Sequence, residues 1–208
     1  MTYISTEGKD KLRLILDDLI IDTLSKSSEL KLYTFVPYNK TLVIEVFSQN
    51  IDEYLYYRIS QNITSTFKKG IENSIKKFSE YLIQSQEGQL ILDPEKTDLK
   101  FKLKNGEVYS IDIKSKFDFE NFNDHYFKVQ NEKAKEIGSK YKLFIYDEDI
   151  EINNDFLLNG NDFWELIAGF EQAKYELFKI INGCANKISL STIIKDAHKR
   201  LLNEWKME

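Results

Sequence analysis

The chain has 208 residues, of which 42% are hydrophobic, 13% aromatic and 30% charged, so a sizeable core is expected and wholesale disorder is excluded. The formal net charge of −5 shows no bulk attraction to nucleic acid, although a nuclease needs only a local basic surface around an acidic metal site. One cysteine and two histidines exclude a disulfide framework, an all-cysteine zinc cage and a histidine-rich metal site.

The chain shows no targeting or membrane signal. Its first residues lack the basic stretch and apolar core of a signal peptide, and no apolar run approaches the roughly 18–20 residues of a membrane span. We therefore expect a soluble cytoplasmic protein. Eight glycines and two prolines leave few places for a linker, so residues 1–208 are predicted to form a single domain.

The N-terminal half is predicted to be mainly helical. Periodic apolar residues over 9–24 predict an amphipathic helix. The β-rich runs 32–36 and 41–47 predict a hairpin, whereas residues 51–67 favour neither helix nor strand. A helix over 70–86, ended by Gly88, is predicted by one buried stripe formed by Ile71, Ile75, Phe78 and Leu82.

The C-terminal half alternates between strands and helices. Two alternating runs, 98–104 and 107–114, are joined by Asn105-Gly106, which is a strong hairpin signal. The remaining predictions are a loop over 117–127, a short helix over 128–137, a buried strand over 141–146, a helix over 162–181 capped by Asp162, and a helix over 191–205. This order predicts a mixed sheet flanked by helices, an α/β or α+β fold.

The second arm of the hairpin carries the residues of chemical interest. Strand alternation places Asp112 and Lys114 on one face and Ile111 and Ile113 on the other. The isoleucines can then bury against helices. A carboxylate and a lysine remain together on the opposite face, where burial is costly unless they pair or hold a metal.

The hairpin register decides whether Asp98 joins them. A two-residue turn at Asn105-Gly106 pairs positions whose numbers sum to 211 and turns Asp98 away from Asp112. A three-residue loop with Gly106 in the left-handed region gives a sum of 210 and places the two β-carbons about 4.5–5.5 Å apart. Because a divalent cation relieves the repulsion of two close carboxylates, we predict the three-residue loop.

Asp98, a 13-residue spacer and Asp112-Ile113-Lys114 resemble the PD-(D/E)xK nuclease motif, most closely that of type II restriction endonucleases, with Thr97 where the family has proline. Residues 70–75 resemble the helix that supplies an extra glutamate, here Glu72, and residues 162–167 resemble a segment that follows the core strands. The resemblance covers residues 68–182 and implies a restriction-endonuclease-like sheet. Residues 189–208 are then expected to form a C-terminal helix. For residues 1–60 two roles are open, a dimer interface or a DNA-facing arm.

The resemblance implies a mechanism. Asp98, Asp112 and the backbone carbonyl of Ile113 are expected to hold Mg²⁺, for which Mn²⁺ can substitute, and Lys114 to orient or help deprotonate the attacking water. Glu72 is expected to act through a water or a second ion. The implied activity is sequence-specific hydrolysis of double-stranded DNA that leaves 5′-phosphates, by a homodimer at a short palindromic site and without a nucleotide cofactor.

Further polar residues are candidates for DNA contact. Lys100 shares the face of Asp98, and the others follow the catalytic strand: Lys116, Asn121, Asn123, His125 and Lys128. Two other functions stay open. One is a DNA repair or junction-resolving nuclease of the same fold. The other is a non-enzymatic interaction protein, in which the acidic and basic residues form surface salt bridges.

Overall fold

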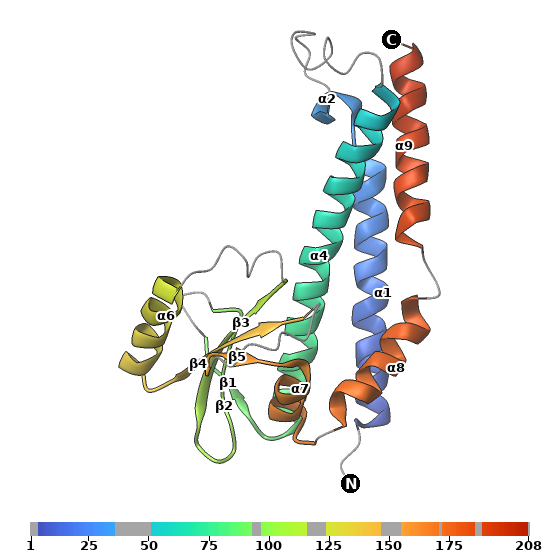
Figure 1. The fold of residues 1–208 in the computed structure, drawn as a ribbon. Helices are drawn as coiled ribbons and strands as arrows, with labels where there is room; N and C mark the ends of the chain where they lie inside the picture. The colour runs from blue at the N-terminus through green and yellow to red at the C-terminus, as the bar shows by residue number, and fades with distance from the viewer. Residues whose placement is uncertain are drawn as a thin grey trace. The chain divides into compact units, whose positions relative to one another are not determined.

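The computed structural model describes residues 4–35, 51–92, 97–115, 124–146, 155–170, 172–185 and 189–207 (Figure 1). The chain divides into two compact units: a sheet unit of residues 1–15 and 72–182, and a helical unit of residues 16–71 and 183–208. The described helices are α1 (Thr6–Glu29), α2 (Leu32–Phe35), α4 (Ile51–Ser85), α6 (Asp124–Glu136), α7 (Gly160–Ala168), α8 (Ala173–Ala185) and α9 (Leu190–Met207). None of these described helices is long and apolar enough to cross a membrane.

The sheet unit is organised around a mixed sheet. Within the described residues its strands follow the order β1 (Gln89–Leu90), β2 (Leu99–Lys102), β3 (Val108–Lys114), β4 (Lys140–Ile145) and β5 (Leu157–Leu158). The pairs β1–β2 and β2–β3 are antiparallel, whereas β3–β4 and β4–β5 are parallel, with α6 in the β3–β4 crossover. The prediction of a mixed sheet with helices is confirmed. The two-residue strands β1 and β5 were not predicted, because so short a strand leaves no alternating pattern.

The β2–β3 hairpin has the predicted register. Leu99 lies opposite Ile111 and Lys102 opposite Val108, so the paired numbers sum to 210. Leu103 and Glu107 close the hairpin, since the N–H of Leu103 donates to the carbonyl of Glu107 at 2.8 Å. The three residues between them form the loop, and Gly106 has a φ of +91° that suits glycine. This register places Asp98 on the same face of the sheet as Asp112.

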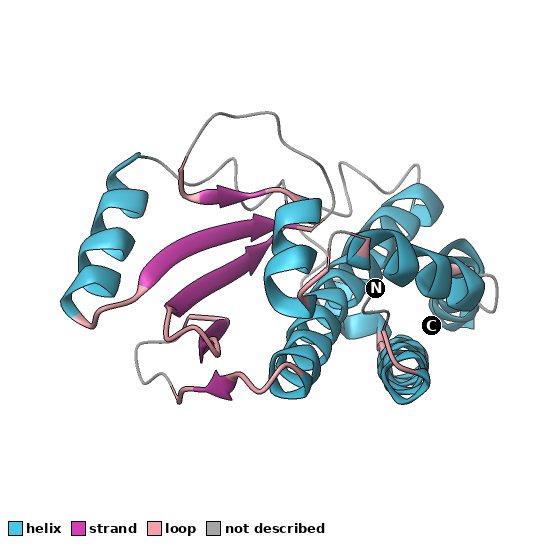
Figure 2. Ribbon diagram, turned by 90° about the horizontal axis from the view of Figure 1, so that it is seen from below, coloured by secondary structure: helices cyan, strands magenta, loops and turns pink. Residues whose placement is uncertain are grey.

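Helices cover both faces of the sheet (Figure 2). On one face, Phe127 of α6 belongs to a buried cluster with Tyr141 and other alternate residues of β4. On the opposite face, Phe144 of β4 stacks on Phe163 of α7 with 3.8 Å between ring centroids. The side chains of β4 therefore alternate between two helical layers, and β4 is buried on both sides.

The helical unit has its own core. It is formed by α2, α4 and α9 through Leu32, Leu55, Ile59, Ile63, Ile193, Ile194, Ala197 and Leu201. Gly70, where the sequence pattern begins a helix, lies inside α4 instead. A Cβ at this position would lie 2.1 Å from Cδ1 of Leu19, so glycine permits the close approach of α1 and α4. Residues 51–67, left undecided by the sequence, are the first half of α4.

Several predicted elements agree with the structure. The helices expected over 9–24 and 191–205 lie within α1 and α9, and the helix expected over 70–86 is the last part of α4, which begins at Ile51 and ends at Ser85. The buried strand expected over 141–146 is β4. The short helix expected over 128–137 is α6, which begins four residues earlier, so the predicted loop is wrong at residues 124–127. Residues 117–123 of that loop lie outside the described residues.

Two other predictions are wrong. Residues 32–35, expected to begin a hairpin, form the short helix α2, where Leu32 joins the helical core; tertiary packing outweighs their β propensity there. The expected second arm, 41–47, lies outside the described residues. The single helix expected over 162–181 is divided into α7 and α8, because Gly169 adopts a left-handed φ of 77° and its N–H caps the carbonyl of Glu165. The N-cap is Asn159, not Asp162.

Candidate functional site

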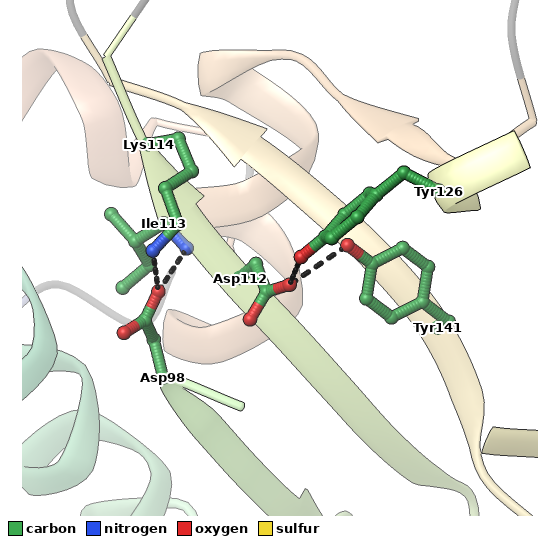
Figure 3. A network of polar contacts seen from close by, with 6 residues as sticks. All are labelled: Asp98, Asp112, Ile113, Lys114, Tyr126 and Tyr141. Atoms are coloured by element: carbon green, nitrogen blue, oxygen red, sulfur yellow. Dashed lines mark hydrogen bonds and ion pairs between the residues drawn. The ribbon is translucent and has the colours of Figure 1, made fainter. Parts of the chain in front are cut away.

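Asp112 lies on β3, facing the layer that contains α6. It is 5% exposed, and its Oδ2 accepts hydrogen bonds from the hydroxyl of Tyr141 at 2.9 Å and from that of Tyr126 at 3.1 Å (Figure 3). Tyr141 comes from the neighbouring strand β4 and Tyr126 from the first turn of α6. Neither hydrogen bond uses the other carboxylate oxygen, Oδ1, which lies on the side of Asp98 in this view.

Asp98 lies just before β2 and reaches the end of β3. Its Oδ2 accepts hydrogen bonds from the backbone N–H of Ile113 and from Nζ of Lys114, both at 2.8 Å. In a β-strand the N–H and the C=O of one residue point to the same side of the strand. The carbonyl oxygen of Ile113 therefore lies on the Asp98 side of β3.

The close approach of these groups changes how readily they ionise. Burial raises the pKa of Asp112, the Tyr141 hydrogen bond opposes this effect, and the charge of Asp98 raises the pKa again. Burial alone would lower the pKa of Lys114. The hydrogen bond to Asp98 and the surrounding negative charges outweigh it, so the pKa of Lys114 is raised and this residue is a firmly held cation. The site therefore concentrates charge that is partly withdrawn from water.

Glu72 belongs to the same charged group. It is half-buried on α4, and its charge is among those that raise the pKa of Lys114. The structure thus brings together, within the sheet unit, the four side chains that the sequence proposed as catalytic: Asp98, Asp112, Lys114 and Glu72.

The two tyrosines act as neutral donors. Burial and the charge of Asp112 raise the pKa of Tyr126 to about 12, and the same two causes also raise the pKa of Tyr141. Both hydroxyls therefore keep their protons at neutral pH. The sequence pattern did not point to either residue, because Tyr126 falls in the segment expected to be a loop and Tyr141 begins an apolar strand. Strand alternation was the available signal, since it places Tyr141 on the same face of β4 as Leu143, the partner of Asp112.

The residues present fit a hard cation such as Mg²⁺. Among the described residues, no three His, Cys, Asp or Glu side chains form a ready-made metal cluster. Mg²⁺ does not need one, because it keeps several waters and is held by one or two carboxylates together with substrate phosphate. The Oδ1 atoms of Asp98 and Asp112 and the carbonyl of Ile113 are the oxygen donors suited to this role.

The candidate DNA-contacting residues that the structure describes lie on different elements. Lys100 is half-buried on β2, on the face of Asp98, and Lys128 is exposed on α6. His125 is the second residue of α6, and nothing is described of its side chain. The remaining three candidates, Lys116, Asn121 and Asn123, lie outside the described residues.

No protein-family model matches the chain, and no curated protein matches it.

Proposed function

We propose that this protein is a Mg²⁺-dependent endonuclease of the type II restriction class, which hydrolyses phosphodiester bonds in double-stranded DNA. The observation that carries the proposal is the convergence of Asp98, Asp112 and Lys114 at the end of β3. Asp98 lies just before β2, whereas Asp112 and Lys114 lie on β3, and the three side chains meet because the paired residue numbers of the hairpin sum to 210. The resemblance of their spacing to the PD-(D/E)xK motif supports the same activity.

Each residue has a role that follows from its surroundings. Asp98 and Asp112 would hold Mg²⁺ with the carbonyl of Ile113, and the ion would supply Lewis-acid activation of the phosphate and of a bound water. Lys114, kept charged by its neighbours, would orient that water and stabilise negative charge developing on the phosphate oxygens. Glu72 would accept a proton through water or hold a second ion.

The reaction itself is a simple displacement. Water adds to phosphorus, the bond from phosphorus to the 3′ oxygen breaks, and the leaving oxygen takes up a proton. The products are a 5′-phosphate and a 3′-hydroxyl. A homodimer acting on a short palindromic site would cut both strands in the same way.

The experiment that tests the proposal is digestion of plasmid DNA by the purified chain with Mg²⁺ or Mn²⁺. We expect discrete fragments, and a loss of about 1,000-fold or more in rate for Asp112→Asn and for Lys114→Met. Glu107→Gln is the matched control, because Glu107 also pairs with a lysine, Lys140, on the same sheet but outside the site. This variant should cut like the wild type.

Sequencing the fragment ends then separates the alternatives. A unique sequence at every end supports a restriction enzyme. Cleavage limited to branched or damaged DNA indicates a repair or junction-resolving nuclease. Cleavage that survives both site substitutions refutes the assigned site, and the absence of any cleavage or Mg²⁺ binding supports a non-enzymatic interaction protein.

A further inference from the structure

Two tyrosine hydroxyls converge on one oxygen of Asp112. Tyr141 and Tyr126 both donate to Oδ2, at 2.9 and 3.1 Å, from two different elements (Figure 3). Asp112 and Tyr141 are buried and Tyr126 is half-buried, so water competes weakly for these hydrogen bonds. Within the described part of the chain, no hydrogen bond reaches Oδ1 of Asp112.

The two oxygens of this carboxylate therefore differ in what they can still bind. Oδ2 already accepts two hydrogen bonds, whereas Oδ1 lies on the side of Asp98 in Figure 3. A cation that took both oxygens would compete with both hydroxyls for Oδ2, and each hydroxyl displaced would lose a hydrogen bond to a charged acceptor, which is costly where water competes weakly. The tyrosines thus favour coordination through Oδ1 alone.

We propose that Tyr126 and Tyr141 are positioning residues that restrict Asp112 to one-oxygen coordination and thereby make the site select Mg²⁺ over Ca²⁺. The inference rests on the proposed function, because it takes Asp112 as a metal ligand. Mg²⁺ requires a near-octahedral shell in which each ligand supplies one oxygen. Ca²⁺ takes six to eight oxygens and commonly uses both oxygens of a carboxylate. Restricting Asp112 to Oδ1 therefore removes a ligand that Ca²⁺ uses and Mg²⁺ does not.

Both donors are held in place by packing as well as by the carboxylate. Tyr141 is a buried member of the cluster between α6 and β4, and Tyr126 packs on the same cluster. Next to it, Phe127 stacks on Phe156, which fixes the start of α6 over the sheet. The hydroxyls are therefore in position before any cation binds, as residues that orient a metal ligand must be.

The test is the ratio of the Ca²⁺ to the Mg²⁺ dissociation constant, from calorimetric titration of the full chain with CaCl₂ or MgCl₂ at pH 8. Tyr126→Phe combined with Tyr141→Phe removes both hydroxyls and keeps both rings. We expect the ratio to fall by about tenfold, as Ca²⁺ gains a second oxygen. A change in the protonation of Asp112 affects both ions alike and cancels in the ratio.

Tyr109→Phe is the matched control. The hydroxyl of Tyr109, on the same strand, donates to a carboxylate oxygen of Glu107 at 3.1 Å, outside the site. Its removal deletes the same kind of hydrogen bond and should leave the ratio unchanged.

The outcomes are distinguishable. A double variant whose ratio stays within about twofold of the wild-type value overturns the positioning role and leaves the metal site standing. A wild-type chain that binds neither ion, or binds them as well after Asp112→Asn, overturns the proposed function together with this inference. Circular dichroism reports whether the double variant folds. If it does not, Tyr126→Phe alone serves, because this ring is only half-buried, with an expected fall of about threefold or more.

Discussion

Replacement of Asp112 by asparagine should stabilise the metal-free fold while it abolishes cleavage. Asp112 is 5% exposed, and its pKa is raised by burial and by the charge of Asp98. Asparagine keeps the shape of the side chain, accepts both tyrosine hydroxyls through its carbonyl oxygen, and removes the buried charge. Its amide group would replace Oδ1 on the side of the Asp98 carboxylate, where a hydrogen-bond donor is favourable.

The expected gain depends on pH in a defined way. Each unit by which a buried carboxyl pKa is raised lowers stability by about 1.4 kcal/mol when the pH lies above both the folded and unfolded values. We expect Asp112→Asn to raise the free energy of unfolding by about 1 kcal/mol or more at pH 8, and Tm by about 2–4 °C. As the pH falls through the raised pKa of the folded state, the Asp112 carboxylate of the wild type takes up a proton, and the loss of stability caused by its buried charge disappears. Below the unfolded value of about 3.9 the difference should vanish.

Trp164 provides a local reporter for this measurement. It lies in the sheet unit, buried against Phe163, whereas Trp205 belongs to the helical unit. A Trp205→Phe background leaves Trp164 as the single tryptophan. Urea unfolding followed by its fluorescence, in EDTA at pH 8, 6 and 4, gives the free energies of both proteins.

Magnesium should then reverse the order of stability. A Mg²⁺ concentration a hundred times the dissociation constant stabilises the binding-competent protein by about 2.7 kcal/mol, and only the wild type retains the Asp112 carboxylate. An asparagine variant that is less stable than the wild type at pH 8 in EDTA would refute the burial argument. A wild type whose unfolding does not respond to Mg²⁺ would refute the metal site.

Three further predictions concern the elements that build the site. Lys114→Met should lower the free energy of unfolding by about 1 kcal/mol, because Asp98 loses its cation. Since the pKa of Lys114 is raised, this lysine is charged at both pH 7 and pH 9.5, and urea unfolding should give the same loss of stability at the two pH values. A smaller loss at pH 9.5 would contradict the pairing of Lys114 with Asp98. Gly106→Ala should lower the free energy of unfolding by about 1 kcal/mol, because the φ of this residue is +91°. A Cβ there would meet no heavy atom within 4 Å, so the loss comes from backbone strain alone. An unchanged Tm would argue against the three-residue loop. Phe163→Ala should cost about 3–5 kcal/mol through loss of the stack on Phe144, measured by urea unfolding, and a cost below about 1 kcal/mol is inconsistent with the packing described.

The hairpin shows how far local sequence information reaches. Asn105-Gly106 marked the turn, and the argument that Asp98 should face Asp112 predicted the register that the structure has. Turn geometry and side-chain alternation, which are local properties of two adjacent strands, left two registers open, and the placement of Asp98 opposite Asp112 selected between them. Lys114 and Asp112 followed from the same alternation.

The helix boundaries show where local information is insufficient. Residues 32–35 have strand-forming side chains but are helical in the structure, where Leu32 is buried among α4 and α9 residues distant in sequence. Gly70 looked like a helix start, yet it lies within α4 and permits close contact with Leu19. In both cases the deciding neighbour is far along the chain, so a pattern read in a short window does not contain it.

The surroundings of Asp112 were decided by tertiary structure alone. The amino-acid sequence by itself determined the mixed character of the sheet, the hairpin register and the identity of the charged residues that share one face. It did not determine that Tyr141 from β4 and Tyr126 from α6 would both donate to Asp112, because these contacts span 29 and 14 residues. The parallel pairing of β3 with β4 and the packing of α6 bring those hydroxyls to the carboxylate. Contacts of that kind depend on the whole layered arrangement, which no short stretch of sequence encodes.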